Sequence, residues 1–482
     1  MDQWFGTDTW FGQLVGAGND FLWTYILIGL LIVLGLYFTV RSRFVQFRML
    51  GEMIRLLFKG TDRSAFKEKK GTSSFQAFAI STAARVGTGN LAGVAVAISL
   101  GGPGAIFWMW LIALIGAASG FIESTLAQIY KVKDKNGFRG GPAYYMEKAL
   151  GARWMGVLFA ILITLCFGLI FNAVQANTMS DAFAGAYNVD PLLLGIIIAV
   201  IMGVIIFGGV RRIAVMSEVI VPVFAIVYVA VALMIMVMNI TEVPAVMALI
   251  VKNAFGIEEV VGGGLGAAIM NGIRRGLFSN EAGMGSAPNA AATAHVSHPV
   301  KQGLVQSLSV FVDTLVICSA TAFIILLTDV YTVGEIEGIQ LTQQALTTHI
   351  GDWAVPFVTI AIFFFAFTSL LGNYYYGETN IEFISQKPWL LLLFRLAVLG
   401  MIVVGATIDL AIIWEMADLF MGTMAIVNLV AIALLAKIAI KALKHYQAQR
   451  AQGKDPVFHK DSIPGLKNVE AWEEERKGEE QS

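Results

Sequence analysis

The stretch 79–100, AISTAARVGTGNLAGVAVAISL, is hydrophobic for long enough to cross a bilayer, yet the sequence GTGN at 87–90 interrupts its middle. No strand pattern precedes these glycines and no Gly-Lys-Ser/Thr follows them, so they are not typical of a nucleotide-binding loop. At membrane depth, non-helical backbone persists only where protein or a water-filled cavity satisfies its polar groups. A break at 86–90 would expose amides that attract an anion and carbonyls that attract a cation. The stretch therefore predicts a broken membrane helix with a binding site, and a glycine-rich packing face is the alternative.

A second segment, 262–288, has the same character. It is too rich in Gly, Asn and charge for a lipid-facing helix. We expect it to be interrupted as well.

Composition sets the class of protein. Of the 482 residues, 57% are hydrophobic and 14% charged, with a mean hydropathy of +0.72, and apolar runs of about 20 residues recur along the chain. This predicts an all-α polytopic membrane protein in contact with the lipid bilayer. We find no basic patch that indicates nucleic acid and no nucleophile, base or metal constellation, so neither an enzyme nor an organic cofactor is predicted. Cys166 and Cys318 lie inside apolar runs and are expected as packed thiols.

Loop charges set the expected topology. Basic residues crowd the segment 41–74 after the first apolar run, so this loop is expected in the cytoplasm, with the N-terminal segment 1–20 outside and the C-terminus inside. In the outside loops Lys252 is the only Lys or Arg. The eleven expected spans are about 21–40, 75–100, 103–130, 154–185, 191–209, 213–238, 262–288, 301–327, 354–384, 388–406 and 410–441.

The spans after the first divide into two sets of five. The two interrupted segments open the sets and run in opposite directions, which predicts an inverted-repeat transporter with its site at the midplane. We expect the first repeat at 75–240, preceded by one extra helix at 21–40, and the second at 241–441. Short external helices, which are candidate lids, are expected at 246–255 and 341–350. The polar tail 442–482 is expected to extend the last helix and then become disordered.

Four motifs carry a family resemblance: ARVGTGNLAGVAVAISLGGPGAIFWMW (84–110), FRGGPAYYM (138–146), RRGLFSNEAGMGSAPNAAATA (274–294) and FAFTSLLGNYYYGE (365–378). Together they resemble the alanine/glycine:cation symporter family of prokaryotes. The resemblance implies a fold similar to that of the bacterial leucine transporter, in the prokaryotic plasma membrane. It also implies uptake of small neutral amino acids, coupled to sodium or sometimes to protons.

An amino-acid substrate presents a carboxylate and an ammonium. The amides of Thr88, Gly89 and Asn90 suit the carboxylate, because glycine lets backbone approach a ligand closely. Unwound carbonyls near Arg85 and within 269–277 would accept from the ammonium. Further pocket residues are expected at Ile273 and Leu277, which share a helix face, and by resemblance at Gln175; ordinary helix packing is the alternative.

Sodium prefers hard oxygen ligands. In the fold implied by the resemblance, the eighth core helix supplies two adjacent hydroxyls, here Thr368 and Ser369. Their expected partners are the carbonyls of Ala83, Val86 and Phe365. The alternative is that both hydroxyls bond back to carbonyls of their own helix.

Two positions depart from the related proteins. Many family members carry Trp where Asn373 stands, and this asparagine could widen the pocket or bond a polar side chain such as that of glutamine or serine. Ala84 stands where the leucine transporter has a sodium-binding Asn, so a second sodium site of that kind is not predicted.

Charged residues within spans are candidates for coupling or gating. Asp313 lies deepest, Arg85 adjoins the first break and is expected to gate through an acid partner, and Glu281 is expected to pair with Arg274 or Arg275. Three other functions stay open: a proton-coupled symporter centred on Asp313 or a glutamate, a glutamine- or serine-preferring member, and a passive channel or facilitator. No pattern in the sequence indicates an oligomeric state.

Overall fold

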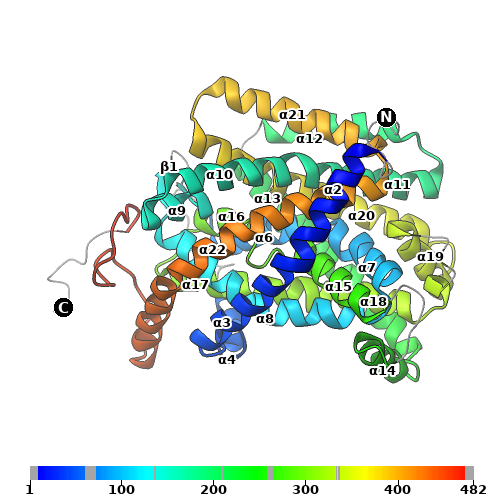
Figure 1. The fold of residues 1–482 in the computed structure, drawn as a ribbon, viewed down its shortest axis with the longest axis horizontal. Helices are drawn as coiled ribbons and strands as arrows, with labels where there is room; N and C mark the ends of the chain where they lie inside the picture. Colours follow the sequence, from blue (N-terminus) through cyan, green and yellow to red (C-terminus); the bar gives the residue numbers. More distant parts are fainter. Residues whose placement is uncertain are drawn as a thin grey trace.

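The computed structural model describes residues 9–59, 72–134, 137–207, 210–257, 264–332, 334 and 337–472. Helices dominate this part of the chain (Figure 1), and a small antiparallel hairpin joins β1 (Val132–Asp134) to β2 (Gly137–Arg139). The expected all-α membrane fold is confirmed, although the hairpin was not expected.

The two halves repeat one order of elements: a broken helix, two long spans, a short or straight span and a final long span. The first half contains α6 (Ser74–Arg85), η3 (Gly89–Gly93), α7 (Val94–Gly101), α8 (Ala105–Ile129), α9 (Pro142–Leu150), α10 (Arg153–Ile163), η4 (Thr164–Phe171), α11 (Asn172–Tyr187), α12 (Pro191–Ile206) and α13 (Val210–Met238). The second half contains α14 (Val243–Ala254), α15 (Leu265–Asn280), α16 (Ala287–Thr293), α17 (Pro299–Phe311), η5 (Val312–Cys318), α18 (Ser319–Leu326), η6 (Val330–Thr332), α19 (Gly338–Ile350), α20 (Ala354–Ile384), α21 (Pro388–Thr407) and α22 (Leu410–Ala451).

Among the described residues, eight helices are long and apolar enough to span a membrane, and the bent pair formed by α6 with η3 and α7 makes a ninth. The remaining two expected spans correspond to α12, a shorter apolar helix, and to α15 followed by α16. The short helices α14 and α19 lie at the end of the molecule opposite α9 and β1 (Figure 1).

The first span begins earlier than the expected 21–40. It runs from Trp10 to Arg41 through α2 (Trp10–Leu22), the π-helical turn η1 (Trp23–Leu27) and α3 (Ile28–Arg41). Asn19 donates to the Glu415 carbonyl at 2.8 Å and the Trp23 indole donates to the Asp418 carbonyl at 3.2 Å. Because of these contacts with α22, the helix includes residues 10–20, which were expected to form part of a polar external segment. Residues 1–8 lie outside the described part.

The break in the first interrupted helix lies where it was expected. A capping box between Ser73 and Gln76 starts α6, which ends at Arg85, and Val86 then leaves helical geometry with ψ 87°. The helix axis bends by 50° across the break. Gly87 is required there, because a Cβ would overlap the Ser369 hydroxyl and lie 2.7 Å from Gln175 Oε1.

The break in the second interrupted helix lies further along than expected. The region 269–277, expected to be unwound, is regular helix within α15, and the non-helical segment is 281–286. Glu281 has φ 56°, Gly283 φ 85° and Gly285 φ 89°. The turn thus uses three left-handed residues, two of them glycines, for which this conformation carries no steric penalty.

The C-terminal tail is ordered as far as residue 472, so the expectation of disorder directly after the last helix is wrong. α22 ends at Ala451, and the following residues fold back onto the body with Phe458, Ile463 and Trp472 buried. Three well-spaced apolar side chains anchor a segment whose average composition is polar. Residues 473–482 lie outside the described part. Two short helices, α4 (Val45–Arg48) and α5 (Leu50–Lys59), follow the first span. Residues 60–71 of the basic loop lie outside the described part of the chain.

Candidate functional site

The oxygens expected to bind sodium converge between α20 and the end of α6. Ser369 Oγ lies 2.8 Å from the Ala83 carbonyl, 3.4 Å from that of Val86 and 3.0 Å from that of Phe365, and the Thr368 hydroxyl lies 3.0 Å from the Phe365 carbonyl. All five residues are fully buried. The Ser369 hydroxyl therefore contacts another helix as well as its own. Neutral hard oxygens without sulfur or nitrogen form a set that fits an alkali cation.

The amides of the first break already have partners. Thr88 N donates to Gln175 Oε1 at 3.1 Å, Gly87 N donates to Asn90 Oδ1 at 3.0 Å, and Asn90 N donates to the Gly87 carbonyl at 3.3 Å. Gln175, expected in the pocket from the family resemblance, thus contacts the break. Thr88 N, a donor that an incoming carboxylate would use, is therefore already bonded to the amide oxygen of Gln175.

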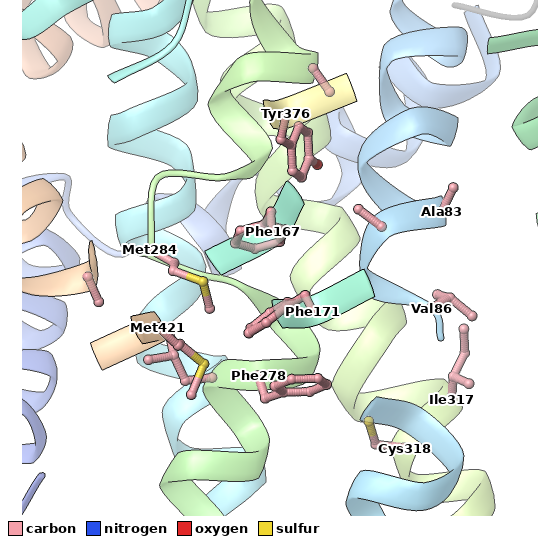
Figure 2. Close-up of a cluster of buried hydrophobic side chains, with 14 of the residues drawn as sticks. Ala83, Val86, Phe167, Phe171, Phe278, Met284, Ile317, Cys318, Tyr376 and Met421 are labelled. Atoms are coloured by element: carbon pink, nitrogen blue, oxygen red, sulfur yellow. The ribbon is translucent and has the colours of Figure 1, made fainter. Parts of the chain in front are cut away.

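An aromatic series borders this break. Phe278 contacts Phe171 with ring centroids 4.5 Å apart, Phe171 contacts Phe167 at 4.5 Å, and Trp414 contacts the other side of Phe278 at 4.6 Å. Figure 2 shows Phe167, Phe171 and Phe278 in succession, on α15 and the neighbouring η4. A Cβ on Gly89 would lie 3.0 Å from the Phe278 ring, so this ring covers the break closely.

Sequence reasoning missed these rings and named two other residues of α15. Ile273 and Leu277 are buried, but the residue that closes over the break is Phe278, directly after Leu277. The available signal was the spacing of Phe171 and Gln175, which are four residues apart and so share one face of a helix.

Asn373 lies one turn beyond Ser369 on α20 and is fully buried. Within the described part of the chain, neither Oδ1 nor Nδ2 of its amide has a hydrogen-bond partner, and the hydroxyl of Tyr376, three residues on, has none either. Leaving such a group unpaired costs about 1–3 kcal/mol. A buried amide in this state is poised to bond a polar ligand.

Asp313 connects the two interrupted helices. Its carboxylate accepts from Asn90 Nδ2 at 2.7 Å on Oδ1, and from Ser279 Oγ at 2.7 Å and Thr314 Oγ1 at 3.1 Å on Oδ2. Asn90 belongs to the first break, Ser279 lies near the end of α15, and Asp313 opens η5. A change in the charge or position of this carboxylate would act on both interrupted helices.

The expected acid partner of Arg85 is not found in the described part of the chain. Arg85 is 2% exposed and donates to Ser309 Oγ, while its Nε and Nη2 have no partner among the described residues. It is close enough to influence Glu123, Glu281 and Asp313 electrostatically, without an ion pair to any of these described residues. The guanidinium is therefore a buried charge that donates to a hydroxyl and has three acids in its vicinity.

The expected pairing of Glu281 with Arg274 or Arg275 is wrong. Glu281 Oε2 accepts from the Ser286 hydroxyl at 2.5 Å, across the second break. Arg275 instead forms a buried ion pair with Asp418 of α22, and Arg274 lies 3.9 Å from the same carboxylate. Glu281 follows the end of α15 in a left-handed conformation, so its side chain does not continue the helical face of Arg274 and Arg275.

Removal of the Asp418 carboxylate is expected to destabilise the fold strongly. Asp418→Ala leaves the Arg275 guanidinium buried without a counter-charge, which costs about 3–5 kcal/mol. The melting temperature of the purified protein in detergent should fall by several degrees. Arg153→Ala breaks the exposed pair with Glu147 and serves as the control, with an expected cost below about 1 kcal/mol. Equal shifts for both variants would contradict the structural role of the buried pair.

The fold and the site define a class. Two interrupted helices contact each other within a helical bundle, with buried hydroxyls, carbonyls and the acids Asp313 and Glu281 at the breaks, as in secondary membrane transporters. The chain matches the sodium:alanine symporter family over residues 8–460. It belongs to this family, whose members are transporters and not enzymes.

Individual relatives support this assignment to the family. The chain is 58% identical to a Bacillus subtilis protein named probable sodium/glutamine symporter GlnT, over 95% of this chain and 96% of the relative. It is 56% identical to the amino-acid carrier protein AlsT of the same organism, over 97% of this chain and 99% of the relative. Among solved structures, a mutant manganese transporter from Eremococcus coleocola matches with a TM-score of 0.50 and 13% identity, covering 78% of this chain and 79% of that one. This last likeness concerns the fold alone.

Proposed function

We propose that the protein is a sodium-coupled symporter that imports alanine or a similar small neutral amino acid by alternating access. It lies in the prokaryotic plasma membrane with its N-terminus outside and its C-terminus in the cytoplasm. The observation that carries the proposal is the convergence of Ser369 Oγ with the carbonyls of Ala83, Val86 and Phe365 within 3.4 Å.

Sodium binds among these oxygens. The Ser369 and Thr368 hydroxyls then turn their hydrogens away and offer oxygen lone pairs, and the ion ties α20 to the broken helix. Because Ala83 and Val86 adjoin the break at Gly87, an ordered cation site also orders the amides that receive the substrate. Each ligand thereby favours binding of the other, which is all that coupling requires.

The substrate carboxylate binds the amides at 88–90 and displaces the Gln175 side chain from Thr88 N. Carbonyls freed at the end of α6 and in the break 281–286 accept from the ammonium. Phe171 and Phe278 wall the side-chain pocket, and their apolar rings favour a small neutral side chain, because they offer a charged one no hydrogen bond.

The helix α19 serves as an outer lid. Its Thr342 hydroxyl donates to the Leu91 carbonyl at 3.0 Å, so it touches the first interrupted helix just beyond the break. Gln343 Nε2 of the same helix donates to Thr359 Oγ1 of α20 at 2.9 Å. Movement of α19 would therefore break or strain contacts with both helices that hold the cation.

Glutamine is a second candidate substrate, favoured by Asn373. A primary amide on the substrate can both donate to and accept from the unpaired amide of Asn373, whereas an alanine side chain leaves it unsatisfied. The relative that is 58% identical is named a probable sodium/glutamine symporter.

Replacement of Asn373 is expected to separate the two substrates. Asn373→Leu keeps the approximate volume but removes both hydrogen-bonding groups, so competition by glutamine against labelled alanine uptake should weaken about tenfold or more. Alanine uptake itself should stay within about threefold, since its methyl group makes no bond to the amide. Asn239→Leu, at the far end of α13, is the matched control. Unchanged competition by glutamine would remove Asn373 from the pocket.

Coupling by protons and passive conduction are separate outcomes of one experiment. Labelled alanine uptake is measured in proteoliposomes with an inward sodium gradient, with potassium in its place, and with an acidic outside medium. Accumulation only with sodium supports the proposal. Accumulation driven by acid moves the coupling ion to the proton, and equilibration without accumulation identifies a facilitator or channel.

A further inference from the structure

The C-terminal tail lies against the end of the molecule that holds β1 and α9 (Figure 1). In the proposed orientation this is the cytoplasmic end. Beyond Ala451 the side chains of Phe458, Ile463 and Trp472 are between 2% and 8% exposed. A charge-rich tail therefore makes a specific contact with the body, at two places.

The first contact is the start of α17. Phe458 N donates to the Ser297 carbonyl at 2.9 Å, and the Ser297 hydroxyl donates to the Pro456 carbonyl at 2.8 Å. Asp455 and Lys301 form an ion pair at 2.6 Å. The Phe458 ring also lies 5.3 Å from that of the buried His298, in an edge-on arrangement.

The second contact is the end of α8. The Trp472 indole donates to the Gln128 carbonyl at 3.0 Å, and the Lys131 ammonium lies 4.8 Å from the Trp472 ring and 4.0 Å from that of Phe138. Trp472 and Phe138 thus enclose a lysine that is 2% exposed. Glu470 pairs with Lys148 of α9 and secures the same stretch.

Lys131 in turn holds the inner ends of the two interrupted helices together. Its Nζ donates to the Ala294 carbonyl at 2.8 Å, and Gln128 Nε2 donates to the same carbonyl at 3.0 Å. Ala294 follows α16 and pairs with Thr72, which precedes α6, while His295 N donates to the Thr72 carbonyl at 2.9 Å. The tail therefore covers the residues that fix the junction of α6 and α16.

We propose that residues 452–472 form a latch on the inner gate. When it is docked, Trp472 shields Lys131 and Gln128 and keeps α6 against the end of α16. When it is released, water reaches the lysine, its hold on Ala294 weakens, and α6 can move away from the bundle. The latch rests on the proposed function in one respect, since it assumes that the inner gate opens during alternating access. The contacts of the tail do not depend on which substrate is transported.

The test measures gate opening directly. Ala77→Cys places a thiol on the buried inner part of α6, in a background with Cys166 and Cys318 replaced by Ala. Labelling by a membrane-impermeant maleimide is followed in inside-out vesicles. Trp472→Ala in the full chain should raise the labelling rate about tenfold, the factor expected for losing one buried cation–π contact and one hydrogen bond. Trp389→Ala, an exposed tryptophan on α21, should leave the rate unchanged.

A reversible cross-link guards against misfolded variants. Lys148→Cys and Glu470→Cys are joined by a bis-maleimide with a cleavable disulfide, which should slow labelled alanine uptake at least about fivefold, with recovery on reduction. Uptake at the unlinked rate after complete cross-linking would overturn the latch. An unchanged labelling rate in Trp472→Ala together with a lower melting temperature would also overturn it, because that result assigns the tail to packing alone. A labelling response in a protein that shows no sodium-driven uptake would keep the latch and refute the proposed function.

Discussion

Replacing Thr368 and Ser369 together by alanine is expected to abolish sodium-driven uptake. The double variant removes both hydroxyl oxygens of the proposed cation site and leaves three carbonyls that cannot enclose the ion alone. Each hydroxyl makes an ion–dipole contact with the cation, for which we take the about 1.5–3 kcal/mol of a hydrogen bond to a charged group, so the apparent affinity for sodium should fall about 100-fold or more. The measurement is labelled alanine uptake into proteoliposomes at increasing external sodium, with a potassium control.

The single variants should rank in a fixed order. Ser369→Ala should cost more than Thr368→Ala, because Ser369 reaches Ala83 and Val86 on the broken helix, whereas the bond of Thr368 stays within α20. Thr423→Ala is the matched control, since among the described residues this hydroxyl bonds only to the Leu419 carbonyl of its own helix. Wild-type sodium dependence in the double variant would return both hydroxyls to the role of ordinary intrahelical bonding.

Asp313→Asn is expected to reduce uptake about tenfold to 100-fold. Asn90, Ser279 and Thr314 all donate to the carboxylate, and an amide offers one acceptor oxygen while its NH₂ group faces a donor. Loss of one charge-assisted bond of this kind accounts for the expected range. Since these donors belong to both interrupted helices, the defect should appear in the transport rate as well as in substrate affinity.

The ion dependence of the Asp313 variant distinguishes two roles. If the carboxylate carries a proton, uptake driven by an acidic outside medium is lost and the sodium-driven part is kept. If it only joins the helices, uptake falls equally with either gradient. Asp190→Asn is the control, because Asn caps a helix as well as Asp does and this residue caps α12. Wild-type uptake with both gradients in Asp313→Asn would leave the acid with no part in transport.

Local sequence patterns were sufficient to predict those structural features that have a local cause. The break at Gly87 was predictable because two glycines in an apolar run leave backbone groups that lipid cannot satisfy. The hydroxyl pair at Thr368 and Ser369 and the polar residue Asn373 lie inside one apolar span, but it was the family resemblance that singled them out. That Ser369 reaches the carbonyls of Ala83 and Val86 was expected only through the family resemblance.

Other features depend on which helices become neighbours. Phe278 covers the break only because α15 ends beside η4, and Arg275 finds Asp418 only because α22 crosses α15. Nothing in the spacing of the sequence distinguishes Phe278 from Leu277, or Asp418 from Glu281, as a partner. The position of the second break also escaped local reasoning, because its left-handed turn is stabilised by contacts such as that of the Gly283 amide with Glu123.

The sequence by itself therefore determined the membrane class, the two interrupted helices and the residue types at their breaks, because burial in lipid penalises every unsatisfied polar group in a way that composition reveals. Only the tertiary structure decided which of those groups meet: the oxygens around Ser369, the bonds that converge on Asp313, and the tail that covers Lys131. Partners separated by hundreds of residues are chosen by packing of whole helices, and pairing of that kind leaves no mark on the neighbouring sequence.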